Sequence, residues 1–577
     1  MNKQVYDFIS NQSKDPIIEW KECKISKQIF PIFESDLEFY EKLSPIFWWK
    51  KYNIPSPLLH PDLRHMRRMC FRNDRNLYHR KCDASWKNII SMFAQDKPYI
   101  VYERSYWWWD NWNALDYWME FDFNRSFFEQ FDELFKKVPL PALLNSNVEN
   151  SDYVNQTDNM KNCYLEFSAC NDENCYYWNR VFDCKYCLDC SVLYNSENCY
   201  ECVDWENLYK CFYCQQSKNC TNCYFLFDCF NCSDCFGCFN LRNQKYKIFN
   251  KQYTEQEYND FLKTYKENIK SYQNLEQLKN FFKQELNKRW IFNASYTNNC
   301  VNTFWWYLFN SKNTYNCYEW WEIEDCKYWL LLNNVKDIQD WNNSVDAEMQ
   351  YEVSTGWLWW FRDIFCLDVW PKCTYLIYSA YCTYSSNLFW CIWLKNQEYC
   401  IFNKKYTKEQ YEILVPKIIE HMQKTGEWWE FFPSSISPFW YNESAWYEYF
   451  PLEKELVSRY GFPWYEKDNN NFNNWKNVLH DNIDNINESI LNQTITCTES
   501  WRMFKIISQE LNFYKMYWLP IPRKHPDIRH LDRFHLKQIR DLHIINCKKC
   551  DKLITSIFDN NQMLKIYCED CYKNEVY

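Results

Sequence analysis

The chain has 577 residues, enough for several domains, and 25% of them are charged, as in an ordinary globular protein. Its formal net charge of −10 argues against a general nucleic-acid coat. The sequence lacks an apolar run near the roughly 18 residues that a membrane span needs, and its first residues lack the pattern of a signal peptide. We therefore expect a cytoplasmic protein without membrane contact, whose 32 cysteines are mostly reduced thiols or metal ligands.

Tryptophan and glycine usage is inverted, with 32 Trp and 4 Gly. Together they reach about the share that glycine alone takes in most proteins, roughly 7%. Several tryptophans also stand where a turn needs glycine, as in STGWLWW (354–360), KTGEWWEFF (424–432) and SPFWYNESAW (437–446). We hypothesise that an alternative genetic code reads UGA as glycine in the source organism, and that these codons are written here as Trp. A truly Trp-rich chain is the alternative.

Residues 1–145 are predicted to form a degenerate zinc-ribbon-like N-terminal module with helices. Its HPDLRH (60–65) recurs as HPDIRH (525–530), at an offset of 465 residues that holds without gaps across the following ribbon. That offset maps the four C-terminal cysteines described below onto Cys82, Ser85, Glu103 and Tyr106. Because one ligand of four remains, we expect a metal-free relic with the same fold.

Residues 146–253 contain cysteine at a twelve-residue period. The ladder consists of Cys163, Cys175, Cys187, Cys199, Cys211, Cys223 and Cys235. A companion follows three residues later, at Cys190, Cys202, Cys214 and Cys238, with Leu226 in the same place. A further ladder of Asn or Asp runs from Asn171 to Asn243.

Neither a helix nor a flat strand explains a period of twelve. The period predicts a Cys-rich β-solenoid, in which equivalent residues stack at the strand spacing of roughly 4.8 Å. Stacked Cys would then fill a narrow interior and stacked Asn would hydrogen-bond at the corners. Because Leu226 replaces one companion cysteine, we favour core packing over the alternative of metal-binding or redox-active thiols. The period resembles that of small insect antifreeze β-helices, although this chain lacks their Thr-x-Thr face.

The next regions repeat this design. Residues 254–292 are predicted to form a helical hairpin, 293–406 a second, degenerate β-solenoid, and 407–465 a helical cap. FWCIWLKNQEYCIFNKKYTKEQY (389–411) repeats FGCFNLRNQKYKIFNKQYTEQEY (236–258), so that Trp390 aligns with Gly237. Residues 466–494 are rich in Asn and Asp and are predicted to be a flexible linker.

Residues 495–577 are predicted to form a C-terminal zinc-ribbon module. Cys547, Cys550, Cys568 and Cys571 have the spacing C-x2-C-x17-C-x2-C. Two such cysteine pairs can wrap one Zn²⁺ tetrahedrally, and a closed four-ligand site is structural. We therefore expect one structural zinc ion, with unmetallated thiols as the alternative.

Basic helices are expected before both ribbons. Residues 60–81 carry seven Lys or Arg against two Asp, and residues 522–552 carry nine against four. Either segment could contact nucleic-acid phosphates. A solvated helix is the alternative, and it is the more usual one in an acidic chain.

Upstream of each ribbon, CKISK…FY…IPSPLLHPDLR (23–64) and CTESW…FY…PIPRKHPDIR (497–529) resemble the probable zinc-ribbon domain family. That resemblance implies four ligand positions, and most of them are altered here. Ser26 and Ser500 replace Cys, His60 and His525 occupy the third position, and Leu63 and Ile528 the fourth. Leu and Ile cannot bind zinc, so we do not expect metal at these two places.

Motifs such as RKCDASWKNIISM (80–92), FDFNRSFFEQF (121–131) and NKQYTEQEY (250–258) resemble uncharacterised cysteine-rich proteins of uncultivated small-genome bacteria. Some look-alikes bear the name of the CaiB/BaiF CoA-transferases, but no residue pattern here supports that activity.

These observations predict a mainly β chain with added helices, in which two short solenoid segments of twelve-residue repeats are flanked by zinc-ribbon-like modules. A phosphate-binding loop, dinucleotide fingerprint, nucleophile elbow and HExxH motif are all lacking. We expect a non-catalytic zinc-binding scaffold whose partner is a protein rather than a nucleic acid. Metal storage or thiol redox through the ladders is the alternative, and a CoA-transferase-like enzyme is a remote one.

Overall fold

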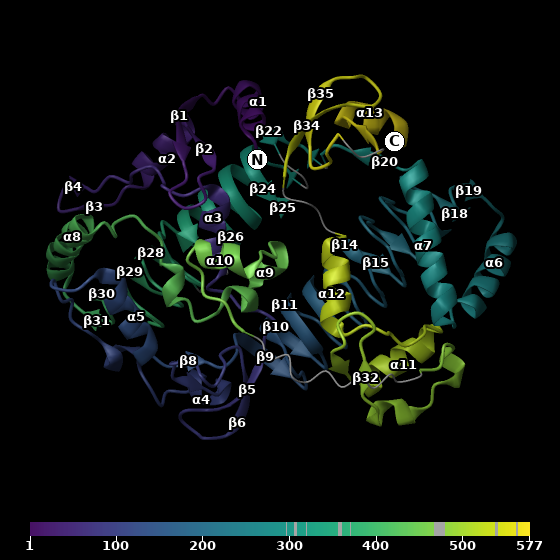
Figure 1. Ribbon diagram of the computed structural model, residues 1–577, viewed down its shortest axis with the longest axis horizontal. Helices are drawn as coiled ribbons and strands as arrows, with labels where there is room; N and C mark the ends of the chain where they lie inside the picture. Colours follow the sequence, from purple (N-terminus) through teal and green to yellow (C-terminus); the bar gives the residue numbers. More distant parts are fainter. Residues whose placement is uncertain are drawn as a thin grey trace.

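The computed structural model describes residues 1–295, 297–304, 308–318, 320–355, 360–369, 371–466, 479–536, 541–560 and 564–577. The chain is mixed α and β, with many small sheets, and not mainly β as expected (Figure 1). Helices in the two terminal modules and beside both repeat regions account for the difference. None of the described helices is long and apolar enough to cross a membrane.

The N-terminal region consists of two small hairpin modules and their helices. The first contains α1 (Lys3–Ser13), β1 (Ile17–Glu22), β2 (Ile29–Phe33), α2 (Glu34–Leu43), β3 (Ile46–Phe47), β4 (Lys50–Lys51) and α3 (Pro61–Met69). The second contains β5 (Tyr78–Lys81), β6 (Asn88–Ser91), β7 (Val101–Tyr102), α4 (Arg104–Trp108), η1 (Ala114–Tyr117), α5 (Phe127–Lys137) and β8 (Leu140–Pro141).

The first repeat region, here called the first stack, pairs its strands in parallel. One sheet contains β9 (Asn145–Glu149), β10 (Asn155–Lys161), β11 (Tyr164–Cys170), β12 (Tyr176–Phe182), β13 (Ser191–Tyr194) and β14 (Val203–Glu206). The other contains β15 (Leu208–Tyr209), β16 (Cys220–Thr221), β17 (Ser233–Phe236), β18 (Lys245–Ile248) and the antiparallel β19 (Lys251–Gln252). Paired residues are twelve apart, as in Tyr164↔Tyr176 and Ser191↔Val203.

The backbone turns at every third residue of this stack. Asn159, Asn162, Leu165 and Ser168 all have φ between 53° and 56°. Four such corners complete one twelve-residue coil, and Asn and Asp tolerate this left-handed conformation better than most residues. The Asn side chains at the corners also hydrogen-bond to the next coil, as the sequence predicted. These bonds include Asn159 to Asn171 (2.9 Å) and Asn207 to Asn219 (2.9 Å).

The cysteines fill the interior of the first stack. They form a buried cluster with a few aliphatic residues, and Cys187, Cys199 and Cys223 have no solvent exposure. Ladder thiols also donate weak hydrogen bonds to backbone carbonyls, as from Cys211 to the Cys220 oxygen at 3.3 Å. Cysteine is thus a small core residue here.

Two helices follow the first stack and are here called the hairpin. It consists of α6 (Glu255–Asn268) and α7 (Tyr272–Arg289). A capping box between Thr254 and Glu257 starts α6. Tyr265 of α6 packs against Tyr224 and Phe236, which stand on the outside of the first stack.

The second repeat region, here called the second stack, is less regular. Its strands are β20 (Ile291–Asn293), β21 (Thr297–Asn298), β22 (Val301–Phe304), β23 (Leu308–Phe309), β24 (Lys312–Tyr318), β25 (Trp320–Trp321), β26 (Ile323–Val353), β27 (Trp360–Phe361), β28 (Cys373–Ile377), β29 (Ser386–Phe389), β30 (Glu398–Ile401) and β31 (Lys404–Lys405). Parallel pairs are eleven residues apart in β22–β24, thirteen in β26–β27, and twelve in β28–β29. Single insertions and deletions in the coils therefore explain why the repeat is faint in the sequence.

Helices follow the second stack. They are α8 (Lys408–Thr425), η2 (Ser434–Ile436), η3 (Tyr441–Glu443), α9 (Ala445–Tyr449) and α10 (Lys454–Arg459). Helix α8 contacts β30 at the end of the stack, whereas η3, α9 and α10 share a buried cluster with the N-terminal module. Of the predicted flexible linker 466–494, residues 467–478 lie outside the described residues. The remainder contains η4 (Ile483–Asn485) and η5 (Glu488–Asn492), and Asn482 pairs with Ser271 at the start of α7. This part is therefore packed against the hairpin.

The C-terminal region repeats the N-terminal design. It contains β32 (Ile495–Thr496), β33 (Met503–Phe504), α11 (Ser508–Tyr517), α12 (Pro526–His535), β34 (His543–Asn546), β35 (Leu553–Ser556), β36 (Lys565–Tyr567) and α13 (Glu569–Val576). Helix α3 of the N-terminal region contacts β26 of the second stack, whereas α12 of the C-terminal region contacts β12 and β13 of the first stack (Figure 1).

Candidate metal centre

The β34–β35 hairpin forms the first half of the centre. Its turn begins at Cys547, whose N–H donates to the Lys552 carbonyl at 2.9 Å. The turn closes at Asp551, whose N–H donates to the Cys547 carbonyl at 3.0 Å. Asp551 adopts φ of 61°. This tight turn places the Cys547 and Cys550 thiols on the same side of the hairpin.

The second half comes from the start of α13: Cys568 follows β36 as the N-cap residue of the helix, and Cys571 lies in its first turn. The sulfur atoms of all four cysteines lie within 4.8 Å of one another, and Cys550 Sγ is 3.7 Å from Cys568 Sγ. Thiolates bound tetrahedrally to zinc at roughly 2.3 Å lie roughly 3.8 Å apart. The structure thus brings together all four residues predicted from the sequence, in a cluster that could hold a metal ion.

The local field favours a thiolate at one of the four positions. Burial raises the pKa of Cys547, but N–H groups of Cys568, Cys550 and Lys549 outweigh burial and lower it to about 6. The N–H of Cys568 donates to Cys547 Sγ at 3.2 Å. Hydrogen bonding with Cys568 is the main cause that raises the pKa of Cys571 to about 12. A cation bound by the four sulfur atoms would favour the ionised form of each thiol, so that all four could be thiolates at once.

The centre lies where the two stacks meet. β36 pairs in parallel with β20 at the start of the second stack, with Ile291 opposite Lys565. Tyr572 of α13 hydrogen-bonds to Asp228 of the first stack and accepts a bond from Arg242 at 3.2 Å. The C-terminal ribbon, which consists of β34, β35, β36 and α13, is therefore joined to both stacks.

The N-terminal copy keeps the turn without the ligands. The N–H of Ser85 lies 3.4 Å from Cys82 Sγ, and the N–H of Glu103 donates to the same sulfur at 3.1 Å. Glu103 takes the place of Cys568 but turns its carboxylate to Lys87, at 3.0 Å. Tyr106 lies in α4, which corresponds to α13. One sulfur of the four positions therefore remains at this place.

The two upstream modules keep similar turns around Cys23 and Cys497. Their Ser26 and Ser500 N–H groups each lie 3.4 Å from the cysteine sulfur. His60 and His525 accept the N–H of Asp62 and Asp527 through Nδ1, and so cap α3 and α12. Burial is the main cause that lowers the pKa of each histidine to about 4. Among the described residues, the C-terminal four-cysteine cluster is the group that meets the geometry of a metal site.

Sequence reasoning missed the contacts that the repeated arginines make. Arg64 and Arg68 of α3 both pair with Asp340 of the second stack, and Arg68 also lies 3.3 Å from Glu352. The offset of 465 maps these arginines onto Arg529 and Arg533 of α12.

Those two arginines make the same arrangement on the first stack. Both pair with Asp189, and Arg533 does so at 2.7 Å. All four guanidinium groups are buried, as are both aspartates. The Arg of HPDxRH and a second Arg four residues later occur in both copies, and this pair is the sequence signal for a docking contact between helix and coil.

The ladder thiols are sealed inside their stack. Burial is the main cause that raises the pKa of the stack thiols Cys187 and Cys190 well above its ordinary value. At Cys211, hydrogen bonds with Cys214 and Cys223 outweigh burial and lower the pKa to about 6. The four C-terminal cysteines differ, because Cys550 is exposed and Cys571 is half-buried. Comparisons with protein-family models and with curated proteins find no match for this chain.

Proposed function

We propose that this chain is a non-catalytic, cytoplasmic scaffold in which one zinc ion in a zinc ribbon holds two β-solenoids together for a protein partner. The observation that carries the proposal is the position of the four-cysteine cluster, in a ribbon that contacts both stacks. Four thiolates suit zinc, and a closed site with four protein ligands is structural rather than catalytic. The parallel pairing at about twelve residues supports the solenoid architecture.

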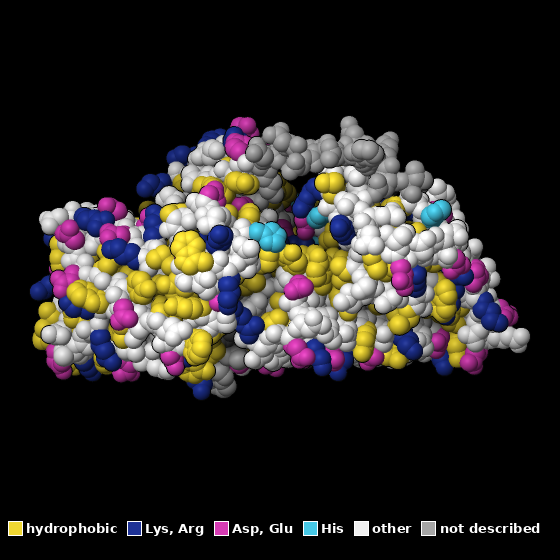
Figure 2. Space-filling model, turned by 90° about the horizontal axis from the view of Figure 1, so that it is seen from below, with side chains coloured by type: hydrophobic (Ala, Val, Ile, Leu, Met, Phe, Trp, Pro, Cys, Tyr) yellow, Lys and Arg dark blue, Asp and Glu magenta, His cyan; other side chains and the backbone are white. Residues whose placement is uncertain are grey.

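A protein partner is supported over a nucleic acid by the contacts of α3 and α12, which lie in the basic segments 60–81 and 522–552; residues 537–540 of the second segment lie outside the described residues. The four arginines of α3 and α12 that meet Asp340 and Asp189 are buried in ion pairs within the chain. They therefore have no free charge for phosphate. Lys/Arg and Asp/Glu side chains are interspersed over the face in Figure 2, unlike the single-sign surface that binds nucleic acids.

Metal storage or thiol redox chemistry remains the second candidate. It needs ladder thiols that ionise and meet solvent, because the thiolate is the metal ligand and the nucleophile. Burial of these thiols favours the scaffold instead.

Elemental analysis tests the metal part of the proposal. On protein produced with UGA read as glycine, we expect one zinc per chain. Cys550→Ser and Cys571→Ser should each abolish stoichiometric zinc, whereas the control Cys170→Ser, at a half-buried thiol of the first stack, should retain it. Four or more metal ions per chain would instead establish the ladders as ligands and support storage.

A salt titration tests the choice of partner. The scaffold proposal predicts no binding of mixed-sequence RNA or duplex DNA at 0.15 M salt. Binding whose affinity falls steeply with salt would show phosphate contacts and favour a nucleic-acid partner. The expected positive result is a saturable protein partner, recovered by crosslinking in cells, that is lost on zinc removal.

A further inference from the structure

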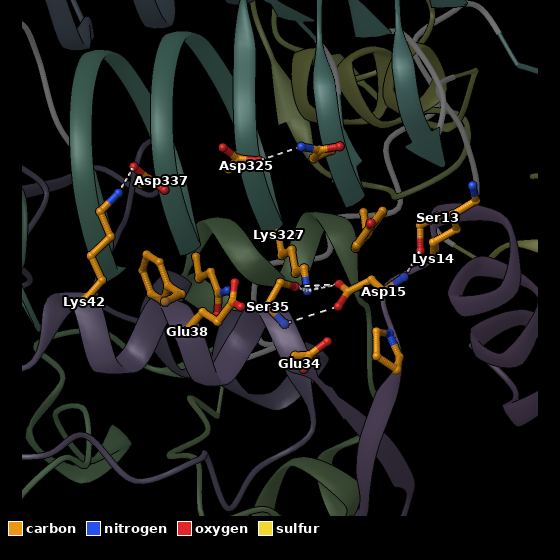
Figure 3. Close-up of a pocket in the computed structure, with 15 residues that line it drawn as sticks. Ser13, Lys14, Asp15, Glu34, Ser35, Glu38, Lys42, Asp325, Lys327 and Asp337 are labelled. Carbon is orange, nitrogen blue, oxygen red and sulfur yellow. Dashed lines mark hydrogen bonds and ion pairs between the residues drawn. The ribbon is translucent and has the colours of Figure 1, made fainter.

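A polar cavity of about 480 Å³ lies between the N-terminal module and the second stack. Its floor comes from α2 and from the turn after α1, and its roof comes from three successive coils (Figure 3). The residues that line it include Asp15, Glu38, Asp325, Lys327 and Gln339. Its volume lies in the range of small-molecule sites, roughly 300–1,000 Å³.

The roof is built by two ladders of the twelve-residue repeat. One ladder contains Asn313, Asp325 and Asp337. The other contains Tyr315, Lys327 and Gln339. Each step along a ladder is one strand spacing of roughly 4.8 Å, so the coils offer polar groups at regular intervals along the cavity.

The one deeply buried cation of the lining is already neutralised. The Lys327 ammonium lies 3.1 Å from Asp15 and 2.9 Å from Asp36, and it donates to Ser35 at 2.5 Å. Figure 3 shows it reaching from the coils toward Ser35 and Asp15. Lys42 is likewise paired, with Asp337 at 2.5 Å.

Gln339 supplies a buried acceptor without a donor. Its side chain lines the cavity and is 2% exposed, and Oε1 has no hydrogen-bond partner among the described residues. Its Nε2 donates to Asp36 at 3.1 Å, and a carboxylate acceptor fixes this orientation of the amide. A buried carbonyl oxygen without a donor is unfavourable, so Oε1 calls for a ligand N–H or O–H.

The charges of the lining residues also favour a ligand with hydrogen-bond donors and positive charge. Five carboxylates line the cavity against three ammonium groups. Glu34 and Glu38 make no ion pair within the described chain, and Asp325 accepts only from Asn313, at 2.8 Å. The free groups at the cavity are thus mainly acceptors and negative charges.

We infer that this cavity binds a small aliphatic polyamine. One ammonium group donates to Gln339 Oε1, and a second lies among the carboxylates of Glu38 and Asp325. The aliphatic carbons between them contact Phe39 and Tyr315, which also line the cavity. This assignment goes beyond the scaffold proposal and does not depend on the zinc site.

Isothermal titration with spermidine at 0.15 M salt tests the inference on the zinc-loaded full chain. We expect saturable binding of one spermidine per chain. Asp325→Asn and Glu38→Gln, at exposed or half-exposed positions, should each weaken Kd about tenfold, which is roughly 1.4 kcal/mol. Gln339→Leu should weaken it at least as much. The matched control is Glu41→Gln, on the same helix but paired with Lys51 and not lining the cavity.

Three outcomes would overturn the inference. The first is the absence of saturable binding up to 1 mM spermidine. The second is an equal loss of affinity in the Glu41→Gln control, which would show general attraction to an acidic surface. The third is full displacement by Mg²⁺ at matched ionic strength, which would show a nonspecific carboxylate cluster. Because Asp325 and Glu38 are not core residues, their variants remain informative even where Gln339→Leu unfolds the protein.

Discussion

At the scale of the residue, the turns around the four hairpin cysteines share one backbone requirement. The fourth residue after the cysteine has a positive φ in every case, at Lys27, Trp86, Trp501 and Asp551. Left-handed φ disfavours residues with a Cβ by roughly 1–2 kcal/mol, and glycine escapes this penalty. Trp86 is 74% exposed and Trp501 is 46% exposed, so neither side chain recovers much of that penalty by packing.

We therefore expect Trp86→Gly and Trp501→Gly each to raise the free energy of unfolding by about 1–2 kcal/mol. The midpoint of urea unfolding measures the change. The contrasting control is Trp178, which is fully buried in β12 and donates from Nε1 to the Cys187 carbonyl at 3.0 Å. Trp178→Gly should lower the free energy of unfolding by about 3–5 kcal/mol.

The proposal that UGA encodes glycine also separates the tryptophans with a left-handed φ from the buried Trp178. Trp390 has φ of 64° and its ring contacts that of Phe127. At the matching Gly237, an added Cβ would lie 2.6 Å from the Phe249 ring. Mass spectrometry of native protein should find Gly at 86, 390 and 501 and Trp at 178. Trp at all four positions would refute the recoding.

Glu166 is a second residue whose environment has a measurable consequence. It occupies the companion position that Leu226 takes five coils later, and neither carboxyl oxygen has a partner among the described residues. Burial is the main cause that raises the pKa of Glu166 well above its ordinary value. The neutral form therefore contributes its full stability below the unfolded pKa near 4.3, and that contribution declines as the pH rises.

Replacing Glu166 should remove this decline. We expect Glu166→Gln and Glu166→Leu to gain stability over the native chain as the pH rises from 5 to 8, by up to about 1.4 kcal/mol per pH unit. Thermal unfolding across this range measures the effect. The half-buried Glu173, which pairs with Lys185 at 3.7 Å, is the control, and Glu173→Gln should leave the slope unchanged. If the stability of Glu166→Gln varied with pH in the same way as that of the native chain, the raised pKa of Glu166 would be contradicted.

At the scale of the element, the contact of each HPDxRH helix with its coil has one critical carboxylate. Asp189 holds Arg529 and Arg533, and Asp340 holds Arg64 and Arg68. Removing one partner of a buried ion pair leaves an uncompensated charge and typically costs about 3–5 kcal/mol.

Reciprocal variants test this contact. Asp189→Asn should speed hydrogen exchange in α12 and leave α3 unchanged, and Asp340→Asn should do the opposite. The control is Asp183→Asn, at an exposed corner of the first stack where the Asp183 carboxylate accepts from Asn171 at 2.9 Å. It should leave hydrogen exchange in both helices nearly unchanged. Equal effects of both variants on both helices would mean that the two contacts are not separate.

The elements also show what the sequence could predict. The Cys and Asn ladders fixed the pairing in the first stack because every coil there has twelve residues. The second stack was predicted less sharply, since its coils differ by one residue and a strict period fails. The four-cysteine cluster followed from its spacing, and so did the serines that replace cysteine at Ser85 and Ser500. The cavity beside Lys327 could not be predicted, because its floor and roof are almost 300 residues apart in the chain.

At the scale of the whole molecule, the chain is arranged crosswise. Helix α3 of the N-terminal module lies against β26 of the second stack, and α12 of the C-terminal region lies against β12 and β13 of the first. Arg72 joins the stacks directly, since its guanidinium donates to Ser168 at 2.7 Å and to Thr355 at 3.0 Å. The two terminal regions also touch each other, through Arg75 and Asp527 at 3.0 Å. Sequence reasoning found the duplication but not this exchange, because no local pattern specifies which stack a helix contacts.

The ribbon at the four-cysteine cluster is a further link between the stacks, beside the hydrogen bonds of Asn240 with Ile291, and zinc removal should therefore act at a distance. Chelation, or Cys568→Ser, frees β36 and α13, and we expect exchange to rise about tenfold or more in Ile291–Asn293 of β20, which pairs with β36. Protection of β11 and β12 should change little. The control Cys82→Ser alters the relic turn and should leave both zinc content and β20 protection intact. Unchanged protection of β20 after complete zinc loss would show that the ribbon is merely attached to the stacks, and the scaffold proposal would then lose its main support.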